Sequence, residues 1–275
     1  MGGSSIFRFL FQNGDCGVNL FFLLSSYGCC YSFSKNNLLQ FYQKRFRRLY
    51  PIYLLFLIYP HLLANESLLV SLSNTLLGIT GLGIFFNSQS WYLEALTIVY
   101  ITFPLLYYSM GYVSKFNVIS IVALLILPVL LCIWIDYYYT QLFVGRIPTI
   151  LLGILIYLHE QREERNKLFL ILGLFALCSL TNLYHASYLF IPATSIMLVA
   201  GQKQYLPFIK FFEFMGKYSL EIYMGHVMAI SFIRKYFSWS TNIWLVLLLF
   251  IVLSTLNAII LHYLQKYYWK IMPKI

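Results

Sequence analysis

One apolar stretch of the sequence, SLEIYMGHVMAISF, carries a histidine that is suited to act as a general base. His226 follows Tyr223 by three residues, so on a helix the two side chains share a face, whereas Glu221 is rotated away from them. Neutral imidazole can take the proton of a hydroxyl near pH 7 while that oxygen attacks an activated carbonyl. The pattern predicts His226 as a catalytic residue and Tyr223 as a substrate contact. Alternatively, His226 only joins helices by hydrogen bonding.

A dense group of cations occupies the stretch FYQKRFRRLYP, residues 41–51. On a helix Lys44 and Arg45 would each share a face with Arg48. Arginine binds phosphate groups through planar, bidentate, charge-assisted hydrogen bonds. Lys44, Arg45 and Arg48 are therefore candidates for binding a phosphate-bearing ligand. The alternative is that these cations only set the membrane topology and contact anionic lipid headgroups.

Glu94 and Arg146 are the charged residues closest to the centre of the predicted membrane segments. Ionisable groups at such depth are costly, and they usually line cavities or pair with one another. Trp91 precedes Glu94 by three residues, so an indole that can stack on a sugar ring and a carboxylate that can accept hydroxyl protons share a face. We expect Trp91, Glu94 and Arg146 to bind a sugar. The alternative is an interfacial tryptophan beside a solvated glutamate.

The composition requires lipid as the solvent for much of the chain. Of its 275 residues, 60% are hydrophobic and only 10% are charged, against about 25% charged in soluble domains. A soluble fold of this length could not bury so much apolar surface. The net charge of +10 falls in short gaps between apolar runs, which indicates orientation in the bilayer and no nucleic acid partner. The five cysteines have no metal-ligand spacing, so we predict no metal.

The fold class that follows is an all-α polytopic membrane protein. The candidate spans are 17–34, 49–64, 68–86, 91–111, 117–135, 146–159, 168–184, 186–201, 214–233 and 242–264. Cytoplasmic loops are rich in Lys and Arg, and most of the 19 cations share one side only if 68–86 does not cross. We expect about nine spanning helices and a re-entrant or buried hairpin at 68–86 that lines the functional cavity. The charged run EQREERNK, 160–167, is expected to be a solvated cytoplasmic turn.

Five stretches in order resemble the acyltransferase-3 family of integral membrane O-acyltransferases. They are GVNLFFLLSS, with Ser26 where the family pattern has Gly, then KRFRRLYPIY, SWYLEALTIVYITFPLL, RIPTILLGILIY and GKYSLEIYMGH. The resemblance implies transfer of an acyl group to a sugar hydroxyl of a cell-surface or lipid-linked glycan, with acetyl from acetyl-CoA as the expected donor group. Lys44, Arg45 and Arg48 would then bind the phosphates of acyl-CoA as it enters from the cytoplasm.

The family's first helix, which carries an Arg and the His regarded as the catalytic base, has no counterpart here. We therefore expect a single membrane acyltransferase-like domain over 1–275 that lacks this helix. The partners would be the lipid bilayer, acyl-CoA and a glycan acceptor, and the location a cell membrane, with the inner membrane of a bacterium as the expected one. Two alternatives stay open: a flippase or transporter of a lipid-linked saccharide, and a truncated, inactive relative.

Overall fold

The computed structural model describes residues 15–64, 68–86, 91–180, 218–236 and 243–271, and every element in these ranges is a helix. The chain divides into two compact units. Unit 1 consists of residues 1–43 and 80–206, and unit 2 of residues 44–79 and 207–275. Each unit is described by itself below.

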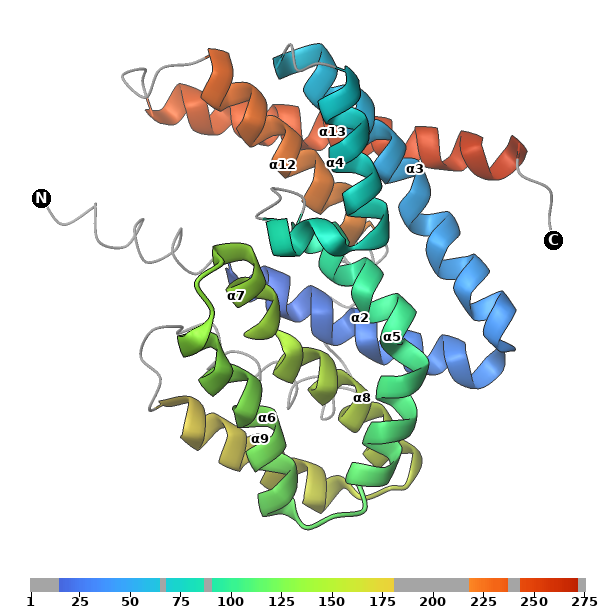
Figure 1. Cartoon of the computed structure of the whole chain (residues 1–275), viewed down its shortest axis with the longest axis vertical. Helices are drawn as coiled ribbons and strands as arrows, with labels where there is room; N and C mark the ends of the chain where they lie inside the picture. Colours follow the sequence, from blue (N-terminus) through green and yellow to red (C-terminus); the bar gives the residue numbers. More distant parts are fainter. Residues whose placement is uncertain (1–14, 65–67, 87–90, 181–217, 237–242, 272–275) are drawn as a thin grey trace, which may run out of the picture. The chain divides into compact units, whose positions relative to one another are not determined.

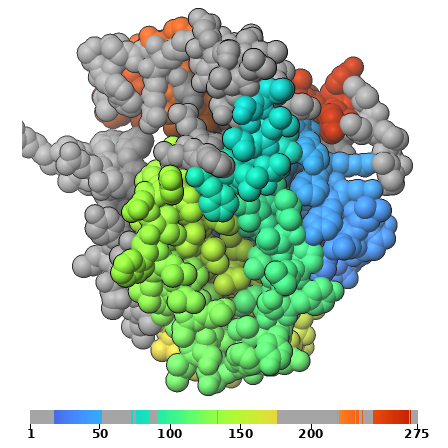
Figure 2. Space-filling view, in the orientation of Figure 1, coloured from blue at the N-terminus to red at the C-terminus, as the bar shows by residue number. Residues whose placement is uncertain are grey.

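Unit 1 is built around one buried helix, α8. Its helices are α2 (Asp15–Lys35), η1 (Leu82–Phe86), α5 (Trp91–Val113), α6 (Val118–Leu131), η2 (Cys132–Trp134), α7 (Tyr138–Val144), α8 (Ile147–Gln161) and α9 (Arg165–Leu180). Every residue of α8 from Pro148 to His159 is buried, and α2, α5, α6 and α9 pack against it (Figure 1). On the face shown in Figure 2, α8 is visible only as a small olive area between α5 and the α6 and α7 segments.

Helices α2, α5 and α8 run in the same direction. Along α2 and α5, Phe22 contacts Tyr92 and Phe33 contacts Tyr107, so the contacts advance together. Along α2 and α8, Ser26 approaches Gly153 and Tyr27 contacts Glu160, again in ascending order. Two parallel spans require an odd number of crossings between them. Because α3 lies between α2 and α5, this direction supports the prediction that 68–86 does not cross.

The predicted hairpin is a helix that is interrupted at a glycine. Helix α4 (Leu68–Thr80) is followed by Gly81 and then by η1. Thirteen helical residues span about 20 Å, less than the ~30 Å of a hydrocarbon core. Gly81 has φ of +78°, and a Cβ there would lie 2.8 Å from the Ile98 Cγ1 atom. Both the left-handed conformation and the close approach of α5 favour glycine at this break.

Helix α3 (Leu38–Ala64) belongs to unit 2 from Lys44 onward, and α4 belongs to it up to Ile79. Unit 2 also contains α12 (Ser219–Tyr236) and α13 (Ile243–Ile271). Helices α12 and α13 approach closely at Gly225, where a Cβ would lie 2.5 Å from the Ser254 carbonyl oxygen. Outward-facing side chains of α13, among them Leu248 and Ile251, are exposed. A bare apolar surface of this kind suits lipid contact.

Three helical segments in the described part of the chain are long and apolar enough to cross a membrane: Trp91–Val113, Tyr138–Gln161 and Trp244–Tyr268. The prediction of an all-α polytopic membrane protein is confirmed. The count of nine spans stays a prediction, because the expected span 186–201 lies outside the described residues. The single domain over 1–275 likewise stays a prediction.

Candidate functional site

The cationic stretch of unit 2 is helical. Lys44, Arg45 and Arg48 lie within α3, which begins at Leu38, ahead of the expected span 49–64. The longer helix strengthens the shared-face argument, because the spacing of three and four residues now falls inside regular α structure. The Lys44 side chain is exposed, and those of Arg45 and Arg48 are partly exposed. All three can therefore reach a ligand outside the protein core.

The backbone carbonyl of Arg48 accepts a hydrogen bond from a residue that is distant in the sequence. The side chain of Gln265 on α13 donates a hydrogen bond from Nε2 to the Arg48 carbonyl oxygen at 2.9 Å, and Gln265 is buried. A carbonyl inside a long helix normally accepts only from an N–H of its own helix, so this contact ties α3 to α13 at the cationic stretch. Sequence reasoning did not identify Gln265. A polar residue in the apolar α13 run was the available signal.

The pair predicted on α12 is present. The Tyr223 and His226 rings lie edge to face, with centroids 4.8 Å apart, which confirms that they share a face. Tyr223 is buried and His226 is partly exposed. The imidazole is therefore oriented by an aromatic neighbour while keeping one accessible side.

A second histidine of unit 2 has a partner that the sequence did not reveal. His262 Nδ1 on α13 lies 3.9 Å from Glu221 Oε1 on α12, and Glu221 is 5% exposed. The Tyr218 ring packs edge to face on His262 at 4.9 Å. Glu221 is rotated away from His226, as expected, because it faces α13. The sequence placed His262 only near a span end, since it could not supply the register between α12 and α13.

Two of the sugar-site candidates of unit 1, Trp91 and Arg146, come into contact at the beginning of α5 and α8. The guanidinium carbon of Arg146 lies 5.0 Å from the centroid of the Trp91 ring, a cation–π contact. Arg146 also donates from Nη1 to the Leu142 carbonyl oxygen at 2.8 Å. Glu94 is 0% exposed, so the alternative of a solvated glutamate beside an interfacial tryptophan is wrong. The structure thus brings an indole and two buried charged groups into unit 1.

The Glu94 carboxylate packs against the interrupted segment. A Cβ at Gly83 would lie 2.6 Å from Glu94 Oε1, so only glycine leaves room for the carboxylate at this point. Thr140 of α7 holds η1 in place by donating from Oγ1 to the Ile84 carbonyl oxygen at 2.9 Å. Glu94 also belongs to the first turn of α5, where the helix dipole favours a negative charge. The η1 part of the segment 68–86 thus lies against Glu94, and the expectation that the segment lines the functional cavity stays a prediction.

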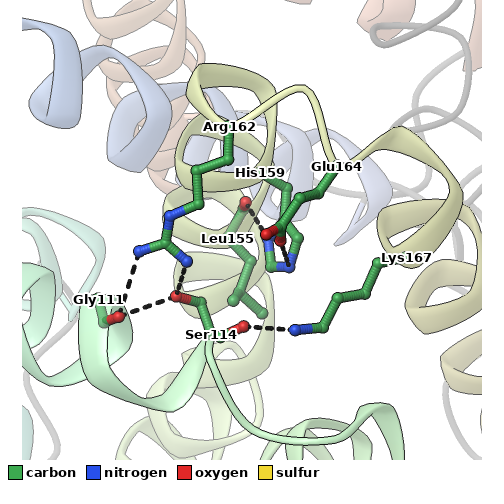
Figure 3. A network of polar contacts seen from close by, with 7 residues as sticks. All are labelled: Gly111, Ser114, Leu155, His159, Arg162, Glu164 and Lys167. Atoms are coloured by element: carbon green, nitrogen blue, oxygen red, sulfur yellow. Dashed lines mark hydrogen bonds and ion pairs between the residues drawn. The ribbon is translucent and has the colours of Figure 1, made fainter.

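The charged turn after α8 is more organised than a solvated loop. Arg162 donates from Nη1 to Ser114 Oγ at 2.8 Å, and Lys167 donates from Nζ to the Ser114 carbonyl oxygen at 2.7 Å (Figure 3). Glu163 and Arg165 in the same turn are exposed. The prediction of a solvated turn thus fits Glu163 and Arg165, whereas Arg162 and Lys167 are bound to the end of α5.

His159, at the end of α8, is enclosed by protein. Its side chain is 0% exposed, its Nδ1 lies 2.9 Å from the Leu155 carbonyl oxygen, and its Nε2 lies 3.6 Å from Glu164 Oε2 (Figure 3). His159 ends the expected span 146–159, and the structure places its side chain inside the protein.

The candidates fall into two groups, each assembled within one unit. Unit 2 contains Lys44, Arg45, Arg48, Tyr223 and His226. Unit 1 contains Trp91, Glu94 and Arg146. The contacts described above join Trp91 to Arg146 in unit 1 and Tyr223 to His226 in unit 2.

Apolar spans and an all-helical architecture define a polytopic helical membrane protein, and several of its charged groups are buried. The family model described as "Acyltransferase domain", of the acyltransferase-3 family, matches residues 1–263. The chain belongs to this family and is a membrane acyltransferase. No curated protein and no solved structure matches the chain.

Proposed function

We propose that this enzyme transfers an acyl group, acetyl in the first instance, from acyl-CoA to a sugar hydroxyl of a cell-surface or lipid-linked glycan. The observation that carries the proposal is the cationic face of α3, where Lys44, Arg45 and Arg48 lie at helical spacing and Gln265 holds the backbone at Arg48. Such a face suits a ligand with several phosphate groups.

The donor would bind at this face. Coenzyme A carries a 3′-phosphate and a pyrophosphate, and two arginines with one lysine supply planar, bidentate donors together with a mobile point charge. The Arg45 and Arg48 side chains are partly exposed, so a ligand outside the protein core can contact them. By the positive-inside rule the cationic stretch faces the cytoplasm, where acyl-CoA is made.

The acceptor would bind at the Trp91, Glu94 and Arg146 group. Trp91 offers a flat apolar surface for a pyranose ring, and the Glu94 carboxylate accepts hydrogen bonds from hydroxyls. Arg146, already placed on the indole ring, donates to ring or hydroxyl oxygens. Together these groups recognise an uncharged polyhydroxylated molecule rather than an anion, because Glu94 and Arg146 balance one another.

The chemical step needs a base and no metal. The acceptor hydroxyl oxygen attacks the thioester carbonyl, and the new C–O bond forms as the C–S bond breaks. His226 would take the hydroxyl proton and pass it to the departing CoA sulfur, so that the products are an ester and free CoA. Tyr223 would hold the imidazole edge-on. The enzyme would work as a multi-pass protein of a cell membrane, with the inner membrane of a bacterium as the expected one.

The test is acetyl transfer from radiolabelled acetyl-CoA by membranes that carry the protein, together with acetyl-CoA binding to the purified protein. Arg45→Ala and Arg48→Ala should each raise the acetyl-CoA Kd roughly tenfold, a loss of about 1.4 kcal/mol. Lys266→Ala, which removes an exposed cation of α13, is the matched control and should leave the Kd unchanged. Unchanged acetyl-CoA binding in both arginine variants would refute the donor site.

The same binding measurement separates the flippase alternative, because a flippase of lipid-linked saccharides has no reason to bind acetyl-CoA. Saturable acetyl-CoA binding without any acetyl transfer would instead favour the inactive relative.

A further inference from the structure

Two buried polar side chains of unit 1 have no role in the site described so far. Asn19 on α2 is 2% exposed and Thr149 on α8 is 0% exposed. Neither Asn19 Oδ1 nor Thr149 Oγ1 has a hydrogen-bond partner. Buried polar atoms are nearly always satisfied by protein, by water or by a ligand, and so each such exception calls for a reason.

Asn19 and Thr149 lie on two helices, α2 and α8, that pack against each other. A Cβ at Gly153 would lie 2.5 Å from the Leu23 carbonyl oxygen, so the two helices approach closely at this level. Because α2 and α8 run in the same direction, one turn earlier on each helix places Asn19 opposite Thr149. Two unsatisfied polar atoms therefore occur at one level of one helix interface.

Asn19 and Thr149 lie at the same end of unit 1 as Trp91 and Arg146, the proposed acceptor-binding residues. The Thr149 backbone N–H donates to the Arg146 carbonyl oxygen at 3.0 Å, so Thr149 belongs to the first turn above Arg146. On the other side, Phe22 lies one turn after Asn19 and packs edge to face on Tyr92 at 5.2 Å. Tyr92 directly follows Trp91 in α5. Asn19 and Thr149 thus lie at the end of unit 1 that holds Trp91.

We propose that Asn19 and Thr149 complete the acceptor subsite as the neutral groups that bind hydroxyls of a pyranose. This inference rests on the proposed function and names the acceptor class of its site, an uncharged sugar ring. The Asn19 Oδ1 atom accepts a hydrogen bond from one hydroxyl, and the Thr149 hydroxyl donates to or accepts from a neighbouring one. Trp91 stacks on the apolar face of the same ring, as aromatic side chains do at sites of this kind.

The test adds methyl α-D-glucopyranoside, methyl α-D-galactopyranoside or methyl α-D-mannopyranoside to the purified protein in a sugar-free detergent. Binding of each probe is followed by the tryptophan fluorescence of the protein. At least one probe should give a saturable change in the wild type. Thr149→Val and Asn19→Leu should each weaken that binding about tenfold, the effect of one lost hydrogen bond. Thr149→Ser, which keeps the hydroxyl, should bind as the wild type does.

The matched control is Thr102→Val on α5, because the Thr102 hydroxyl already donates to the Ile98 carbonyl oxygen within its own helix at 2.8 Å. The affinity of the Thr102→Val variant for the pyranoside should equal that of the wild type. The inference fails if no pyranoside binds, or if Thr149→Val and Asn19→Leu bind as tightly as the wild type. A change only in thermal stability would also overturn it, because the pair would then hold a structural water.

Failure of the proposed function is seen in a separate signal. The acetyl-CoA affinity of the Arg45→Ala and Arg48→Ala variants tests the donor site, whereas pyranoside affinity tests the pair. The acetyl-CoA measurement can refute the donor site while the pyranoside measurement supports the Asn19 and Thr149 pair, and the reverse is equally possible.

Discussion

Gly153 lies so close to Ser26 that a Cβ on this glycine would be 2.0 Å from the serine Oγ atom. The Ser26 hydroxyl is directed back to the Leu23 carbonyl oxygen of its own helix at 2.9 Å, so it cannot simply turn away without losing that bond. This close approach seats the buried helix α8 on α2. It also explains how a Ser is accommodated where the family pattern has Gly, since the facing helix supplies the glycine.

Gly153→Ala should therefore destabilise the protein by about 1–3 kcal/mol, the usual effect of overpacking a close interface. Thermal unfolding in detergent micelles, followed by tryptophan fluorescence, measures the change. Gly173→Ala is the matched control, because a Cβ at this exposed position of α9 would meet nothing within 4 Å. Alanine favours helix over glycine, so the control should be neutral or slightly stabilising.

Ser26→Gly should partly rescue Gly153→Ala. It removes the Oγ atom at 2.0 Å, but the Leu23 carbonyl oxygen at 2.5 Å remains. Equal melting temperatures for Gly153→Ala and the wild type, or no gain from the added Ser26→Gly, would contradict this description of the interface.

The elements that the sequence predicts well are those whose signal is local. Apolar runs gave the spans, and the positive-inside rule gave the direction in which α5 runs relative to α2. A segment 68–86 that does not cross was expected, and the structure places the break in it at Gly81. Trp91 and Glu94 could be paired because three residues along a helix fix a common face.

The contacts that the sequence does not predict depend on the register between helices. Glu221 meets His262 because Gly225 lets α12 approach α13 closely, and Gln265 reaches Arg48 across α3 and α13. Register is set by side-chain volumes along two faces at once, so it cannot be read from either helix alone. The start of α3 was misplaced for a different reason: charged residues resemble a loop in an apolar chain, although Lys and Arg are good helix formers.

Gln265→Leu should raise the KM for acetyl-CoA a few-fold and leave kcat nearly unchanged. The substitution keeps the size of the side chain but removes the hydrogen bond to the Arg48 carbonyl oxygen, worth about 1 kcal/mol, so the cationic face loses one constraint without losing a charge. Initial rates of acetyl transfer over a range of acetyl-CoA concentrations provide both constants.

Gln40→Leu, at an exposed position of α3, controls for a general effect of the same change on the membrane protein. A fall in kcat with an unaltered KM in Gln265→Leu would show that Gln265 does not act through the donor site.

Arg162→Gln should lower the stability of unit 1 by about 1 kcal/mol, because the hydrogen bond to Ser114 Oγ joins the turn after α8 to the end of α5. Arg165→Gln removes the same charge from the exposed first residue of α9 and should have no measurable effect. Cleavage of the turn by trypsin under native conditions reports the change independently: cleavage after Lys167 should become faster in Arg162→Gln. Identical melting temperatures for the two variants would show that the network of Figure 3 does not hold the turn.

Glu221 and His262 should be energetically coupled. The buried Glu221 carboxylate lies 3.9 Å from the imidazole, so removing either partner leaves the other polar group without its neighbour in a largely apolar interface. Glu221→Gln and His262→Gln should each destabilise the protein, and the double variant should lose less than the sum, with a coupling energy in the usual range of about 0.5–3 kcal/mol. A double-mutant cycle on thermal or denaturant unfolding in one detergent gives this value directly. Strictly additive losses would mean that α12 and α13 are joined only by the close approach at Gly225, and that the charged pair adds nothing to their register.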